Sequence, residues 1–107
     1  MDEFTLRVAR EFRDRLRAAL GGALRGVSVF GSRARGDGAP DSDLDVLVLV
    51  AARRGDVADR AYEAALDVGL ANGIYISPRV IAAADFDSRQ WAVIPFIRNV
   101  KREGIAV

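Results

Sequence analysis

The chain contains 107 residues, half of them apolar, with 15 acidic against 16 basic side chains and no cysteine or histidine. This length suits a single domain, residues 1–107, with one modest core. The near balance of charge argues against a general nucleic-acid binder, which usually carries a large basic excess. The missing cysteine and histidine exclude disulfides, zinc–thiolate sites and imidazole bases, so any metal ion must be held by oxygen atoms.

The apolar pattern predicts helix, strand and strand in the first half of the chain. Apolar side chains at four-residue steps predict an amphipathic helix over residues 3–21, which the Gly21–Gly22 pair ends. A short strand, residues 27–30, follows between glycines. Residues 31–42 are polar and form a loop or a short helix with a turn. The apolar run 44–50 is typical of a buried central strand.

The second half continues with helix, strand and helix. A helix over residues 56–71 has Asp56 as its expected N-cap and a stop at Asn72–Gly73. The strand 74–82 contains Pro78, which cannot donate to a ladder, so we expect an edge strand or a bulge. The last helix begins near Pro95 and ends at a glycine, residue 104. The predicted fold class is therefore α/β (α+β), a small mixed β-sheet covered by helices in the order α-β-β-α-β-α.

No segment suggests export or a membrane. The N-terminus is charged throughout and lacks the apolar core of a signal peptide. The longest apolar run, residues 46–52, is far shorter than the roughly 20 residues that cross a bilayer. We expect a cytoplasmic protein with no membrane partner.

Two carboxylates open the predicted central strand. Asp43 and Asp45 lie two residues apart, so strand alternation places both on one face. Such neighbours repel each other, and a cation between them relieves the repulsion. Magnesium typically binds a pair of this kind together with substrate phosphates and water.

The turn before this strand supplies groups that suit phosphate. Gly31 lets the backbone approach a ligand closely, and the amides after it point toward an anion. Ser32 adds a hydroxyl, while Arg33 and Arg35 add permanently charged donors. The segment 31–45 therefore predicts a site for a triphosphate and a metal ion.

An EF-hand, a P-loop and a plain solvated turn fit this segment less well. Residues 41–45 imitate the start of an EF-hand, but that loop needs glycine and glutamate where this chain has Val46 and Ala52. A P-loop needs a Gly-Lys-Ser/Thr ending, which is absent. A solvated turn would suit any one of these residues alone. Because these polar and charged residues occur together at the start of an apolar strand, we favour the metal–phosphate site.

The pattern Gly31-Ser32, Gly36 and Ser42-Asp43-Leu44-Asp45 resembles the signature of the polymerase-β-type nucleotidyltransferase superfamily. The short chain is similar to the minimal nucleotidyltransferase branch, the antitoxin-like partners of HEPN toxins. Segments 76–78 and 95–105 are similar to parts of such small proteins. The resemblance implies the nucleotidyltransferase fold over most of the chain.

The resemblance also implies a reaction and a set of residues for it. A nucleoside triphosphate, ATP or another, would be bound through Mg²⁺, with room for two ions, and its nucleoside monophosphate transferred to a hydroxyl of a protein or small molecule. Asp43 and Asp45 would be the catalytic and metal-binding pair. The nucleotide- and phosphate-binding residues would be Gly31, Ser32, Arg33, Arg35 and Ser42. The implied protein partner is a HEPN-type toxin, in a toxin–antitoxin system.

One expected acid is missing from the pattern. Active members carry a third carboxylate on the next strand, and alignment from Ser77-Pro78 places it at Tyr75. This departure supports an alternative function: a weakened or inactive nucleotide-binding subunit that acts by binding its toxin. The apolar stretch around Trp91 and Phe96 is expected to pack in the core, and an interface for a homo-oligomer or a partner stays an open alternative.

Overall fold

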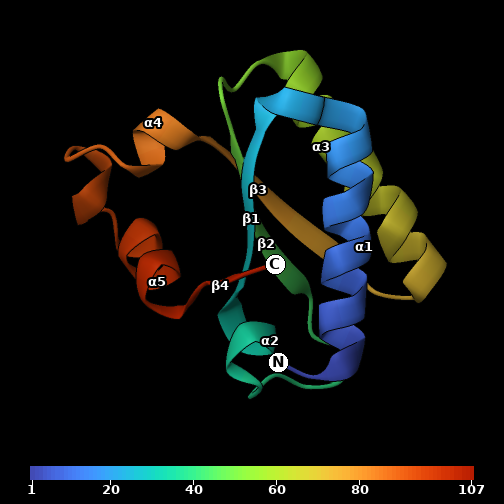
Figure 1. Ribbon diagram of the computed structural model, residues 1–107. Coiled ribbons are helices and arrows are strands. Elements are labelled where there is room, and N and C mark those ends of the chain that lie inside the picture. Colours follow the sequence, from blue (N-terminus) through green and yellow to red (C-terminus); the bar gives the residue numbers. More distant parts are fainter.

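Four strands form one mixed sheet in the order β3-β2-β1-β4 (Figure 1). The computed structural model describes all 107 residues. Strand β1 is antiparallel to both β2 and β4, whereas β2 and β3 are parallel. The strands are β1 Leu24–Phe30, β2 Leu44–Val50, β3 Ile76–Ala82 and β4 Ile105–Ala106. The predicted mixed sheet is confirmed, and the strand with Pro78 lies at its edge.

Helices cover both faces of this sheet (Figure 1). The long helices α1 and α3 lie side by side on one face, and the segment from α4 to α5 lies on the other. The α-helices are α1 Glu3–Leu20, α2 Gly31–Arg35, α3 Gly55–Asn72, α4 Ala83–Phe86 and α5 Pro95–Glu103; the 3₁₀ helices are η1 Gly21–Ala23 and η2 Trp91–Val93. No helix combines the length and the apolar composition that crossing a bilayer requires.

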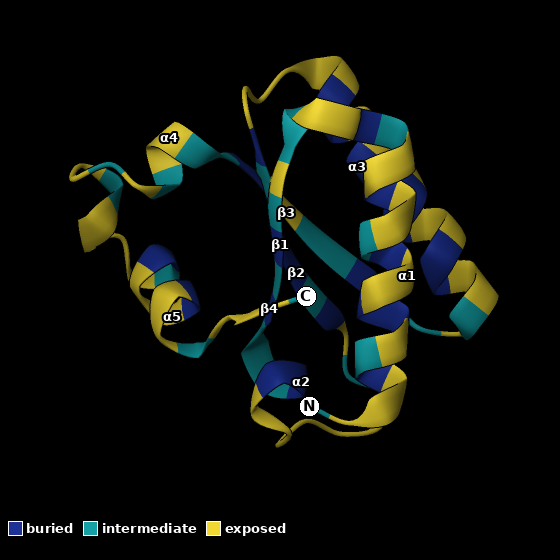
Figure 2. Cartoon of the chain, in the orientation of Figure 1, coloured by how far each residue is buried: buried dark blue, intermediate teal, exposed yellow.

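The core has two parts because β2 alternates between the two faces. Val46 and Val48 pack with Phe12 and Leu16 of α1 in the larger cluster. Leu47 points the other way and packs in a smaller cluster with α5. Burying each such large side chain contributes roughly 1.5–3 kcal/mol. Figure 2 shows the buried centre of the sheet and the largely exposed chain that follows α4.

The ends of the three predicted helices lie within one residue of their predicted positions, and one predicted N-cap is corrected. The expected N-cap of α3 is wrong: the helix begins one residue earlier, and Arg54 is its N-cap without a side-chain bond. Asp56 lies in the first turn, where its negative charge interacts favourably with the helix dipole. Gly73 ends α3 in a left-handed conformation, as predicted. Pro95 begins α5 and Gly104 caps its end, as predicted.

Strand β3 starts at Ile76, two residues later than predicted. The amide of Ile74 donates to the carbonyl of Gly69 at 3.0 Å, so this residue still closes the end of α3. The outer edge of β3 is protected in two ways: Pro78 has no amide to offer, and Arg53 Nε donates to the carbonyl of Val80 at 3.0 Å.

Candidate active site

The site lies where β1 ends and β2 begins. The antiparallel register pairs Phe30 with Asp45, and Gly31 follows directly as the first residue of α2. Both predicted parts of the site, the Gly31–Ser32 turn and the Asp43–Asp45 pair, therefore lie at the same end of the sheet (Figure 1).

Gly31 is in direct contact with a carboxylate. Its φ of 75° is a conformation that glycine adopts without strain. A Cβ at this position would overlap Oδ2 of Asp45. Glycine is therefore required twice here, by the turn and by the close approach of the backbone to Asp45.

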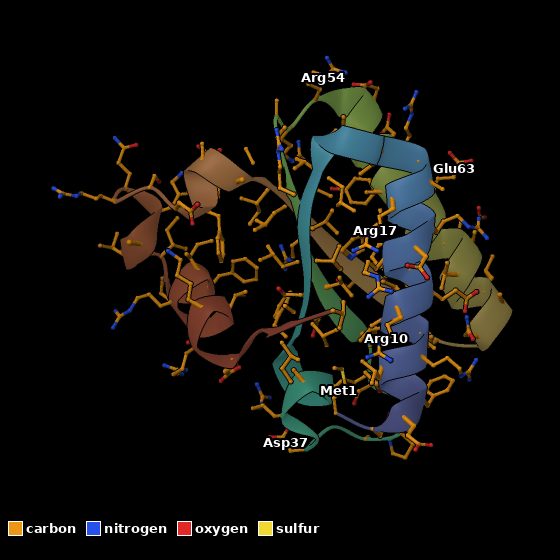
Figure 3. The ribbon with its side chains drawn as sticks, in the orientation of Figure 1. Met1, Arg10, Arg17, Asp37, Arg54 and Glu63 are labelled. Atoms are coloured by element: carbon orange, nitrogen blue, oxygen red, sulfur yellow. The ribbon has the colours of Figure 1, made fainter.

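The two serines of the predicted phosphate site also come together. The loop after α2 folds back so that a Cβ on Gly38 would lie 2.6 Å from Ser32 Oγ and 2.8 Å from Ser42 Oγ. Figure 3 shows Asp37 in this loop, at the same end of the molecule as Met1. The loop places both hydroxyls beside the Gly31 turn.

Arg33 forms hydrogen bonds that hold the loop after α2 in place. Its side chain is buried, and the guanidinium donates to three oxygens of the protein. The acceptors are Ser42 O at 2.7 Å, Thr5 Oγ1 at 3.0 Å and Pro40 O at 2.7 Å. These bonds tie the loop to the first turn of α1. The sequence predicted that Arg33 binds phosphate, and that role stays a prediction; in the structure its guanidinium donates to protein oxygens.

Arg35 is likewise engaged by the protein. It is exposed and forms ion pairs with Asp37 and Glu103, each at 3.0 Å. The hydrogen bond to Asp37, followed by that to Glu103, raises the pKa of Arg35. The pair with Glu103 links α2 to the end of α5. The sequence predicted a phosphate donor at this position; in the structure its guanidinium contacts two carboxylates of the chain, and the phosphate role stays a prediction.

Asp43 is exposed and Asp45 is half-buried, on the sheet face that α5 covers. Burial raises the pKa of Asp45; the charge of Asp43 raises it further, and the charge of Arg79 opposes this. A divalent cation would relieve this repulsion. No group of three or more acidic, histidine or cysteine side chains could hold a metal ion. The donor set fits a magnesium ion held by one or two carboxylates and completed by substrate phosphates.

The strand beside Asp45 carries no acid. The parallel register pairs Asp45 with Ser77, so Ser77 occupies the place next to this carboxylate. Tyr75 lies just before the strand, is 64% exposed, and its carbonyl accepts a bond from the amide of Leu44 at 2.9 Å. Alignment placed the third carboxylate at Tyr75, whereas the residue that lies beside Asp45 in the structure is Ser77, two residues later.

Arg79 is a residue of this site that the sequence did not predict. Its charge acts on Asp45, and its guanidinium lies 5.5 Å from the centre of the Phe96 ring. The alternation of Ser77 and Arg79 along one strand face was visible in the sequence. The parallel pairing that brings this face beside Asp45 was not.

These features define the class of the protein. The chain belongs to the nucleotidyltransferase domain family, whose model matches residues 9–103. A search of curated proteins finds no match. A solved structure described as a candidate minimal nucleotidyltransferase is 27% identical with a TM-score of 0.60, over 100% of this chain and 97% of that one.

Two further solved structures share the fold. One is a toxin–antitoxin complex with AMP-PNP, 19% identical with a TM-score of 0.58 over 89% of this chain and 68% of that one. The other is a mutant of the toxin–antitoxin complex MntA–HpeT, 17% identical with a TM-score of 0.58 over 95% of this chain and 70% of that one. The predicted nucleotidyltransferase fold is confirmed.

Proposed function

We propose that this domain binds a nucleoside triphosphate, ATP or another, through Mg²⁺ and transfers its nucleoside monophosphate to a hydroxyl of a protein or small molecule. One observation carries the proposal: Gly31 brings the phosphate turn into contact with the carboxylate of Asp45. Membership of the nucleotidyltransferase family and the fit of two carboxylates to a phosphate-bound magnesium ion support it.

Each residue has a distinct task in this proposal. Ser32, Ser42 and the amides of the Gly31 turn bind the terminal phosphates. Asp43 and Asp45 hold the metal, which neutralises charge on the phosphates when bound. In the transfer, the acceptor oxygen bonds to the α-phosphorus, the bond from that phosphorus to pyrophosphate breaks, and the hydroxyl proton passes to solvent water. Ser77 provides no carboxylate beside this point, so the site is better equipped for binding than for turnover.

Calorimetry with ATP and Mg²⁺ tests this proposal. We expect saturable binding that chelation of Mg²⁺ abolishes and that Asp43→Asn weakens at least tenfold. Asp14→Asn, which removes an exposed carboxylate of α1 on the layer opposite Asp43 and Asp45, serves as the charge-matched control and should bind as the wild type does. Equal affinity of Asp43→Asn and the wild type for Mg-ATP would contradict the proposal that Asp43 binds the metal ion.

A second candidate function is an antitoxin-like subunit that binds a HEPN-type toxin. One surface favours it: an apolar groove of about 510 Å³ between α3 and the edge of β3. Its exposed side chains include Leu66 at 59%, Leu70 at 74% and Tyr75 at 64%. The acidic side chains Asp59 and Glu63 lie on the exposed side of α3 beside them, so a partner with an apolar patch and basic rim would fit. The toxin–antitoxin complexes with this fold add support.

Labelled ATP separates the two candidates. The protein is incubated with Mg²⁺ and the purified product of its neighbouring gene. Label transfer that Asp43→Asn abolishes identifies an enzyme, whereas a stable complex without transfer identifies a binding subunit. Leu70→Asp should break that complex, and Val93→Asp should not, although both side chains are 74% exposed.

A further inference from the structure

The parts of the site lie in a fixed order across the sheet. The phosphate turn follows β1, the carboxylates lie on β2, and Arg79 lies on β3. These strands are neighbours in the order β3-β2-β1. A line from the turn across the carboxylates therefore leads to β3 and Arg79.

Arg79 is free to bind a ligand. The six ion pairs of the structure all involve other side chains. The guanidinium is exposed and lies over the ring of Phe96, which restrains it by a cation–π contact. Arg33 and Arg35 are held by protein oxygens, so Arg79 is the arginine beside Asp45 that retains its donors for a phosphate.

A hollow adjoins Arg79 at the edge of β3. It measures about 490 Å³, and its lining includes Ser77, Arg79, Trp91 and Phe96. This volume is within the range of small-ligand pockets. The wall combines three aromatic rings with two guanidinium groups, those of Arg53 and Arg79, which is the chemistry that binds a planar base next to a phosphate.

We propose that this hollow takes the nucleoside end of the bound triphosphate, with Arg79 binding the α-phosphate and Trp91 and Phe96 packing against the base. The inference rests on the proposed function and extends it to substrate choice. The lining contains no Asn, Gln, Asp or Glu side chain. Besides Arg79 and Ser77, its polar side chains are Arg53 and Tyr62, and Arg53 donates to the carbonyl of Val80 and to the hydroxyl of Tyr62. Stacking tolerates every base because each has a flat face. The site should therefore accept ATP, GTP, CTP and UTP within about tenfold of one another.

Trp91 reports on this hollow directly because it is the only tryptophan of the chain. Its fluorescence is followed while Mg-ATP or Mg-tripolyphosphate is added. We expect ATP to change the emission with the same Kd that calorimetry gives. Tripolyphosphate, which lacks the nucleoside, should bind while leaving the emission unchanged. An equal change with both ligands would overturn the placement of the base.

The role of Arg79 is tested with Arg79→Gln against Arg98→Gln, an exposed arginine of α5 that does not line the hollow. Arg79→Gln should weaken ATP binding about tenfold or more, since it removes a charged hydrogen bond. It should weaken tripolyphosphate binding by a similar factor, because that ligand also presents a phosphate at the α position, and Arg98→Gln should change neither. If Mg-ATP binds but Arg79→Gln equals the wild type and Trp91 emission stays constant, the inference fails while the proposed function stands. If ATP does not bind at all, both fail.

Discussion

At the level of single residues, Gly31 holds the phosphate turn and Asp45 together. Gly31→Ala forces a strained φ and an overlap with the carboxylate of Asp45. We expect a loss of at least about 2 kcal/mol in unfolding free energy together with weaker Mg-ATP binding, measured by denaturation and calorimetry.

Gly36 provides the matched control for this change. It has a similar φ of 79°, but a Cβ there would meet nothing within 4 Å. Gly36→Ala should therefore cost about 1–2 kcal/mol of stability through backbone strain and leave the affinity for nucleotide intact. Equal losses of affinity in both variants would contradict the role given to the contact with Asp45.

The raised pKa of Asp45 makes a prediction about pH. A folded-state pKa above the ordinary value of 3.8 means that the folded protein binds this proton more tightly than the unfolded chain. Ionisation of Asp45 therefore lowers the free energy of unfolding as pH rises from the pKa of the unfolded chain through the raised pKa of the folded protein. Asp45→Asn should unfold at higher denaturant than the wild type at pH 7. This difference should shrink as pH falls through the raised pKa of folded Asp45 and should be gone below about pH 3.9. A less stable Asn variant at pH 7 would contradict it.

The sequence was sufficient to predict the positions of some of these residues in the site, but not the contacts of others. The glycine turn and the alternating carboxylates are local patterns, and the structure brings Gly31, Asp43 and Asp45 to one end of the sheet. Arg33 could not be assigned from local pattern, because its acceptors include a carbonyl nine residues later and a hydroxyl in α1. Arg79 depends on strand pairing that no short motif encodes.

At the level of elements, the loop after α2 is held to α1 by Arg33. Arg33→Met would leave the hydroxyl of Thr5 and two carbonyls of the loop without this donor. We expect a loss of about 3 kcal/mol in unfolding free energy, measured by urea denaturation. Arg35→Gln removes only exposed ion pairs and should cost about 1 kcal/mol or less. A smaller loss for the buried arginine would refute this role of Arg33 in the loop.

The register of β3 decides where a third carboxylate belongs. Ser77 lies beside Asp45, whereas Tyr75 precedes the strand. If the missing acid limits transfer, Ser77→Asp should raise the rate of label transfer from ATP to the acceptor, and Tyr75→Asp should raise it less. Circular dichroism would check that both variants fold. The opposite order of rates would contradict the placement of Ser77 beside the reacting atoms.

The elements themselves were predictable in proportion to their length and pattern. The strand at residues 44–50 was predicted with its observed bounds because it is a continuous apolar run between polar segments. The short α4, η2 and β4 were missed because such segments have no measurable periodicity. Strand β4, for example, has two residues and exists through its pairing with β1.

At the level of the whole molecule, two neighbouring hollows along the edge of β3 have different expected roles. The polar end and the hollow beside Arg79 face the segment that contains α5, whereas the apolar groove lies between α3 and the edge of β3. A nucleotide and a protein partner could therefore bind without competing for the same side chains, apart from Tyr62 and Pro78, which line both hollows. This arrangement is compatible with the enzyme and with the antitoxin-like subunit.

A crystal structure with AMP-PNP and Mn²⁺, located by its anomalous scattering, tests the central claim most directly. We predict a manganese peak bonded to carboxylate oxygens of Asp43 and Asp45, with the terminal phosphates against the Gly31–Ser32 turn. A nucleotide bound elsewhere, or bound at this turn with no metal on these carboxylates, would contradict the claim.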